Sequence, residues 1–195
     1  MLRRLYTLFP DVAVASLLLF PVFYIFNRFL FQNNRKASAY YALALYYCAV
    51  FTLVGLPDIC YFRFRLNMNL QPFAYMFSDL DSTLLNVLLF VPLGFSLPIL
   101  WTKFRKFFLT VGFGLLSSLL IEILQIFTYR ASDVNDLITN TFGTLIGWIM
   151  AAICLQHRSL SVSEQQTHNL WIISGTALGT MFFVHPLFSK SACAP

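Results

Sequence analysis

Long apolar runs separated by short polar corners dominate the chain. The runs lie at about 12–31, 39–57, 82–101, 107–128, 134–155 and 169–188. A helix needs roughly 20 mostly apolar residues to cross the hydrocarbon core of a bilayer. The pattern therefore predicts an all-α protein: a polytopic membrane bundle of about six transmembrane helices that interacts with the lipid bilayer.

One connecting segment has a different period. In residues 61–70 apolar and polar side chains alternate, which indicates a short extended segment at the membrane interface. Its arginines, Arg63 and Arg65, would then face water or lipid phosphate. A short interfacial helix is expected to follow at 73–77.

Composition agrees with a membrane protein and restricts its partners. The chain is 58% hydrophobic and 11% charged, with a formal net charge of +5. A soluble domain has roughly 25% charged residues. No basic cluster is dense enough to predict nucleic-acid binding, so the basic excess is attributed to membrane topology and anionic lipid. The four cysteines lack metal-ligand spacing, and a Cys60–Cys193 disulfide is one alternative to free thiols.

Polar residues inside the fourth and fifth runs carry the candidate chemistry. Glu122 and Gln125 share one helix face with Ser118, and Asp136 and Asn140 share one face of the next helix. Glycines continue both stripes: Gly114 on the first, and Gly143 and Gly147 on the second. We expect the two stripes to face each other, because small residues allow close approach and polar residues bond helices together.

These polar groups converge with others at one membrane face. The third span begins, the fourth ends and the fifth begins on the same side, which also holds the 58–81 loop. Counted from residue 128, Glu122 would lie about 9 Å below the end of its helix. The predicted ligand-binding residues are Asn86, Glu122, Gln125, Arg130, Asp133, Asp136, Asn140, Arg63 and Arg65.

The basic loops favour an outward-facing pocket. Six basic residues lie on each side, so the count alone does not decide. Those opposite the pocket are concentrated in short loops, whereas those on the pocket side share their segments with acidic residues. Short basic loops are typical of the cytoplasmic face. The residues opposite the pocket are Arg35, Lys36, Lys103, Arg105, Lys106 and Arg158.

In their combined order, several short motifs resemble the VanZ-like family of bacterial membrane proteins. They are Asn69–Phe73, Asn86, Leu89–Phe95, Glu122, Gln125, Arg130, Asp133, Asp136, Asn140–Gly143 and Gly147. The resemblance implies an N-terminal transmembrane extension at 1–38, a VanZ-like core at 39–155, and a loop and C-terminal helix at 156–195. It also implies a cell-envelope protein, since the founding member is associated with teicoplanin resistance.

Three functions are compatible with these residues. The pocket could bind an anionic lipid or a lipid-linked cell-wall molecule, with the arginines on phosphate or carboxylate. Alternatively, Glu122 could act as general acid or base in an intramembrane enzyme, and Asp133 and Asp136 could hold a divalent cation. No cofactor is predicted otherwise. In the third reading, the polar residues only bond helix to helix.

Overall fold

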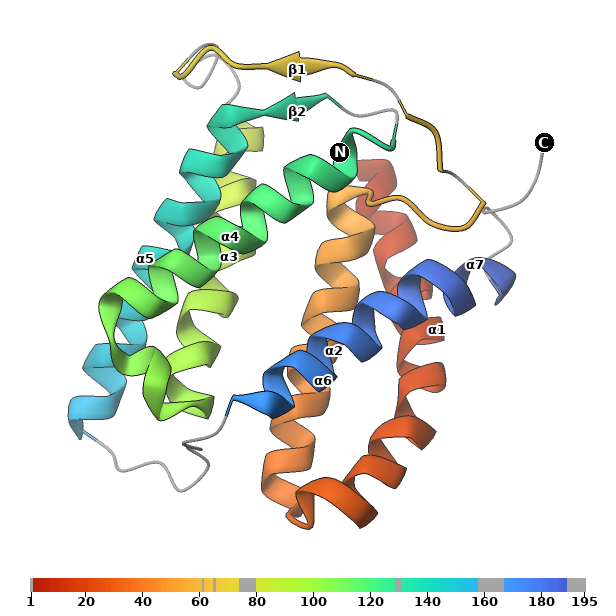
Figure 1. The fold of residues 1–195 in the computed structure, drawn as a ribbon, viewed down its shortest axis with the longest axis vertical. Coiled ribbons are helices and arrows are strands. Elements are labelled where there is room, and N and C mark those ends of the chain that lie inside the picture. The colour runs from red at the N-terminus through yellow and green to blue at the C-terminus, as the bar shows by residue number, and fades with distance from the viewer. Residues whose placement is uncertain are drawn as a thin grey trace. The chain divides into compact units, whose positions relative to one another are not determined.

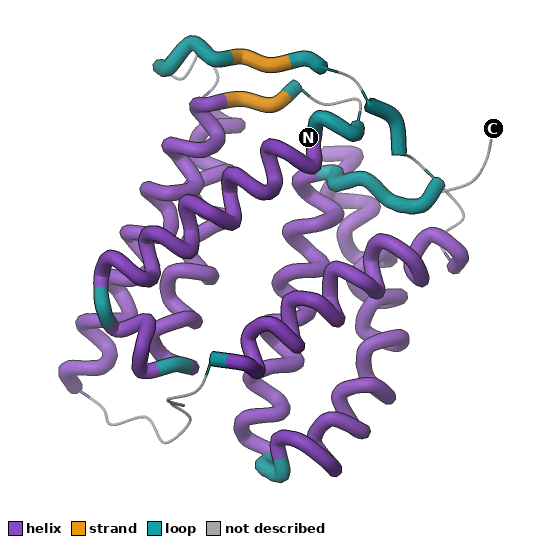
Figure 2. Tube along the Cα trace, viewed as in Figure 1, coloured by secondary structure: helices purple, strands orange, loops and turns teal. Residues whose placement is uncertain are grey.

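The computed structural model describes residues 2–60, 62–64, 66–73, 80–128, 131–157 and 167–188. Helices account for most of the described chain, and the strands form a single short pair (Figure 2). Five helices are long and apolar enough to cross a membrane: Leu8–Phe31, Asn34–Val54, Leu80–Leu100, Phe107–Gln125 and Val134–Gln156. The predicted all-α membrane fold is confirmed.

The chain divides into two compact units, 1–64 with 168–195 and 65–167. The first contains the helices α1 (Leu2–Phe26), α2 (Asn34–Val54), α6 (His168–Gly179) and α7 (His185–Phe188). Two π-helical segments, η1 (Asn27–Phe31) and η3 (Thr180–Val184), continue α1 and α6. The predicted sixth span is therefore helical from 168 to 188 with a π-helical stretch inside it, and it is not among the five candidate membrane spans.

Local chemistry explains the boundaries of α2. The side chain of Asn33 accepts the backbone N–H groups of Arg35 and Lys36 at 3.0 and 3.1 Å, which caps the helix N-terminus. The basic residues predicted to lie in a loop therefore belong to the first turn of α2. Gly55 ends the helix with φ 67°, a left-handed conformation that glycine adopts without steric cost.

The second unit contains α3 (Leu80–Leu100), a 3₁₀ turn η2 (Thr102–Arg105), α4 (Phe107–Gln125) and α5 (Val134–His157). In Figure 1 the strands β1 (Met68–Asn69) and β2 (Ser132–Asp133) lie side by side near the start of α5. They pair in parallel, with Met68 opposite Ser132 and Asn69 opposite Asp133. The predicted extended segment thus forms a regular strand over two residues only.

Helix α5 packs most extensively on α3. A Cβ atom added at Gly143 would collide with the Val87 carbonyl oxygen, and one at Gly147 would collide with that of Val91. Such contacts bring two helix backbones together at the closest distance that side chains allow. The expectation that both glycines face α4 was therefore wrong, because they form the interface with α3.

Candidate functional site

The polar stripe of α4 does face α5, at Ser118 and Glu122. The side-chain amide of Asn140 donates to Ser118 Oγ at 2.9 Å. One helical turn along α4, Glu122 Oε2 accepts the Ser132 hydroxyl at 2.9 Å and the Asp133 backbone N–H at 2.7 Å. One turn in the other direction, the Thr144 side chain lies directly against Gly114. The predicted contact between the two stripes is confirmed at Ser118 and Asn140.

Glu122 is held at the N-terminal end of α5. A carboxylate in the last turn of its own helix α4 is placed unfavourably in the helix dipole, whereas the start of another helix attracts negative charge. The side chain is 6% exposed and lies within a membrane span. Because α4 ends at Gln125, the carboxylate residue lies about 4.5 Å below the helix end, half the predicted depth.

Asp133 caps α5. Its Oδ1 accepts the Asn135 backbone N–H at 2.8 Å and the Asn135 side-chain amide at 2.9 Å. Its Oδ2 accepts the side-chain amide of Asn69 at 3.0 Å. Both oxygens therefore bind neutral donors, and the residue serves as an N-cap.

Asp136 is connected to α3. Asn86 donates its side-chain amide to Asp136 Oδ1 at 2.6 Å. The predicted proximity of these two residues is confirmed, across the α3–α5 interface and one turn along α5 from Asn140. Within the described ranges no group of three or more His, Cys, Asp or Glu side chains is arranged to hold a metal ion.

Asn140 carries a buried acceptor. The residue is 3% exposed, and its Oδ1 has no hydrogen-bond partner among the described residues. A buried carbonyl oxygen without a donor costs roughly 1–3 kcal/mol. This acceptor lies one helical turn along α5 from Asp136, and helix packing alone does not explain it.

Sequence reasoning missed two members of the cluster, Ser132 and Asn135. Ser132 binds Glu122, and Asn135 Oδ1 accepts the Phe73 backbone N–H at 2.6 Å while its Nδ2 donates to the Gln71 carbonyl at 3.2 Å. The available signal was the sequence Ser132–Asp133 directly before a helix, which is typical of an N-terminal cap. Asn135 thereby fastens the 66–73 segment to the start of α5.

The other predicted site residues are placed differently. Gln125 is buried, at 2% exposed, in the last turn of α4. Arg63 is exposed and belongs to the first unit. Arg65 and Arg130 lie outside the described residues, as do positions 74–77 of the predicted interfacial helix and Cys193 of the predicted disulfide. Cys60 itself is disulfide-bonded.

Five apolar spans and a buried polar cluster within the second unit define a multi-pass membrane protein with a candidate polar site. The chain belongs to the VanZ/LLP1 family, whose profile matches residues 12–155 and so includes the first span. It is similar to Protein VanZ of Enterococcus faecium, with 27% identity over 154 residues that cover 78% of this chain and 91% of the relative. No solved structure matches the chain.

Proposed function

We propose that this VanZ-like envelope protein binds the polar head of a lipid or a lipid-linked cell-wall molecule at the α4–α5 corner. The observation that carries the proposal is the buried Oδ1 of Asn140, which has no partner in a site built from membrane-spanning helices. A ligand donor would remove the cost of leaving that oxygen unbonded. Glu122, one turn along α4 from the Ser118 that binds Asn140, supplies a further acceptor.

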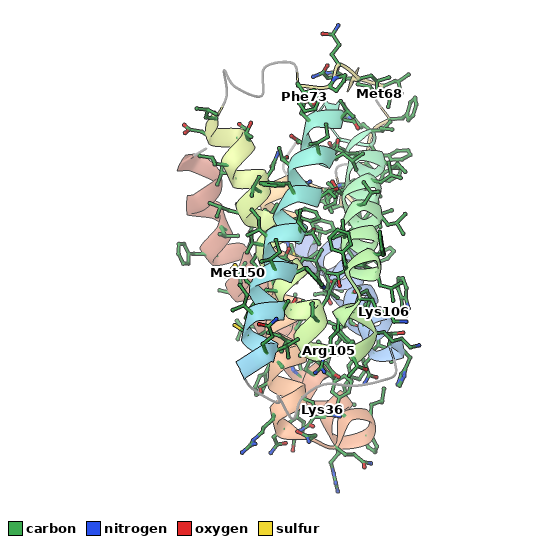
Figure 3. All side chains as sticks on the ribbon, turned by 90° about the vertical axis from the view of Figure 1, so that its left-hand side faces the viewer. Lys36, Met68, Phe73, Arg105, Lys106 and Met150 are labelled. Carbon is green, nitrogen blue, oxygen red and sulfur yellow. The ribbon has the colours of Figure 1, made fainter. Side chains whose placement is uncertain are left out.

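The proposed site opens to the outer face. Cys60 lies in the segment between the second and third spans, on the membrane side where the α4–α5 corner is also expected. Its disulfide supports an oxidising, extracytoplasmic location for that side. In Figure 3, Arg105 and Lys106 lie at the end of the second unit opposite Met68 and Phe73, and a basic cytoplasmic loop there agrees with the positive-inside rule.

Arg130 and Arg65 remain candidates for binding a phosphate or carboxylate of the same ligand. Their role is a prediction from the sequence, as is a link to teicoplanin resistance. In the enzyme alternative, Glu122 would be the acid or base. A cation at Asp133 and Asp136 would share these carboxylates with the amide donors of Asn69, Asn135 and Asn86. The unpartnered Asn140 Oδ1 instead calls for a hydrogen-bond donor, so the binding function is preferred.

The test is identification of molecules that co-purify with the protein. The full chain, Glu122→Gln and the control Asp81→Asn are purified in mild detergent, and bound molecules are measured by mass spectrometry. Asp81 is an exposed carboxylate in the first turn of α3, at the same end of the unit. We expect one envelope lipid to be retained by the parent and the control and reduced about tenfold in Glu122→Gln. Identical bulk lipid in all three would refute the proposal.

A further inference from the structure

The polar cluster presents acceptors to a ligand. The side-chain amides of Asn69, Asn86 and Asn140 each donate to another member of the cluster, namely Asp133, Asp136 and Ser118. By contrast, Asn140 Oδ1 has no partner, and both hydrogen bonds to the Glu122 carboxylate are made to Oε2. A carboxylate has about four acceptor positions, so Oε1 retains its capacity to accept.

Among the residues that the structure describes, no positive charge faces the Glu122 carboxylate. No described Lys, Arg or His forms an ion pair with this carboxylate; its two donors are a hydroxyl and a backbone amide. A buried charge without an opposite charge is costly, and more so within a membrane span. The basic side chains Arg105 and Lys106 lie at the other end of the unit (Figure 3).

We infer that the head group bound here carries a protonated primary amine, which donates to Glu122 Oε1 and Asn140 Oδ1. This inference rests on the proposed function and specifies the ligand class. An ammonium group has three donors and no acceptor, so it complements a site of acceptors and supplies the missing positive charge. Glu122 and Ser118, the partner of Asn140, are one turn apart, about 6 Å along α4, which one small head group spans.

The alternative head groups fit this chemistry less well. A phosphate would bring negative charge and acceptors to a carboxylate and a carbonyl oxygen, so it must remain outside this layer. A quaternary ammonium provides charge but has no N–H to donate. A neutral polyol provides donors without charge. Among these head groups, the primary amine satisfies both requirements, a positive charge and an N–H donor.

The inference is tested by comparing three short-chain lipids that share one glycerophosphate backbone and end in ethanolamine, choline or glycerol. Each is titrated into the purified full chain, and the dissociation constant is measured by native mass spectrometry. We expect ethanolamine to bind about tenfold more tightly than choline, with glycerol weaker than ethanolamine. In Glu122→Gln this preference should fall to about threefold or less, while Asp81→Asn should keep it. Thermal unfolding verifies that both variants are folded.

The outcomes separate this inference from the proposed function. Equal, saturable binding of all three lipids that is lost in Glu122→Gln would overturn the amine and leave the lipid site standing. An amine preference that survives in folded Glu122→Gln would overturn the role of Glu122. Phosphoethanolamine, which has no acyl chains, is titrated as a fourth ligand. If it binds as tightly as the ethanolamine lipid, the amine-binding site is supported and a lipid ligand is refuted. No saturable binding of any probe would overturn the amine inference, whereas the co-purification experiment decides the proposed function.

Discussion

Glu122 Oε2 accepts the backbone N–H of Asp133 at 2.7 Å, so the end of α4 is bonded to the start of α5. With the Ser132 hydroxyl, this contact closes the corner between the two helices through a buried carboxylate. The same residue therefore has a structural role at Oε2 and the proposed ligand-binding role at Oε1. Substitutions that preserve one role and remove the other can separate them.

Glu122→Gln should fold, whereas Glu122→Leu should be destabilised. The glutamine carbonyl can still accept from Ser132 and Asp133, but leucine leaves both donors without a partner. We expect the free energy of unfolding to fall by less than about 1 kcal/mol for glutamine and by roughly 2–3 kcal/mol for leucine. Reversible unfolding in detergent measures both. If glutamine is as destabilised as leucine, the carboxylate charge is itself required for the fold.

Asp133→Asn should be tolerated and Asp133→Ala should not. Asparagine caps helix N-termini about as well as aspartate, whereas alanine removes the acceptor for the Asn135 N–H. The expected losses in the free energy of unfolding are about 0.5 kcal/mol or less for asparagine and about 1–2 kcal/mol for alanine. The cation-binding alternative would instead be supported by two results together: Asp133→Asn folds but no longer binds the ligand, and a chelator abolishes ligand binding by the parent protein.

Gly143→Ala should weaken the α3–α5 interface, because its Cβ would collide with the Val87 carbonyl oxygen. The matched control is Gly112→Ala in α4, where a Cβ meets nothing within 4 Å. We expect a loss of roughly 2 kcal/mol or more in the free energy of unfolding for Gly143→Ala. Gly112→Ala should be unchanged or more stable by up to about 1 kcal/mol. Equal stability of the two variants would contradict the close approach of these helices.

Asn135→Ala should release the 66–73 segment from α5. The variant loses the acceptor for the Phe73 N–H and the donor to the Gln71 carbonyl, while Asn135→Asp keeps the acceptor alone. Hydrogen exchange of the Phe73 amide should be about tenfold faster in alanine than in aspartate, equivalent to about 1.4 kcal/mol. An unchanged exchange rate in Asn135→Ala would show that other contacts hold the segment.

The disulfide at Cys60 predicts the orientation of the protein. In intact cells, a membrane-impermeant thiol reagent should label the two cysteines of this disulfide, Cys60 among them, only after reduction, because both thiols are otherwise oxidised. Thr102→Cys, in the turn between α3 and α4, should react only after the cells are lysed. The labelling is read in a background without the free thiols Cys48 and Cys154. The opposite accessibility of the two positions would place the polar corner in the cytoplasm.

Apolar run length and helix periodicity predicted much of this protein from the sequence alone. The five spans agree with the predicted runs, because about 20 apolar residues in a row have few alternatives to crossing a bilayer. The spacing of Ser118 and Glu122 placed them correctly on one face of α4, and Asn140 on the face of α5 that meets them. Periodicity determines such faces because the helical repeat is fixed.

The tertiary structure decided which neighbour each face contacts. One face of α5 is wide enough to meet two helices, so Gly143 packs against α3 while Asn140 turns to α4, a choice that depends on three-dimensional packing. The bond from Ser132 to Glu122 crosses the chain reversal between α4 and α5, and the bond between Asn135 and Phe73 joins residues far apart in the sequence. Helix periodicity predicts neither contact. The unpartnered Asn140 Oδ1 exists only because the folded helices surround it, since in an unfolded chain water would bind that oxygen.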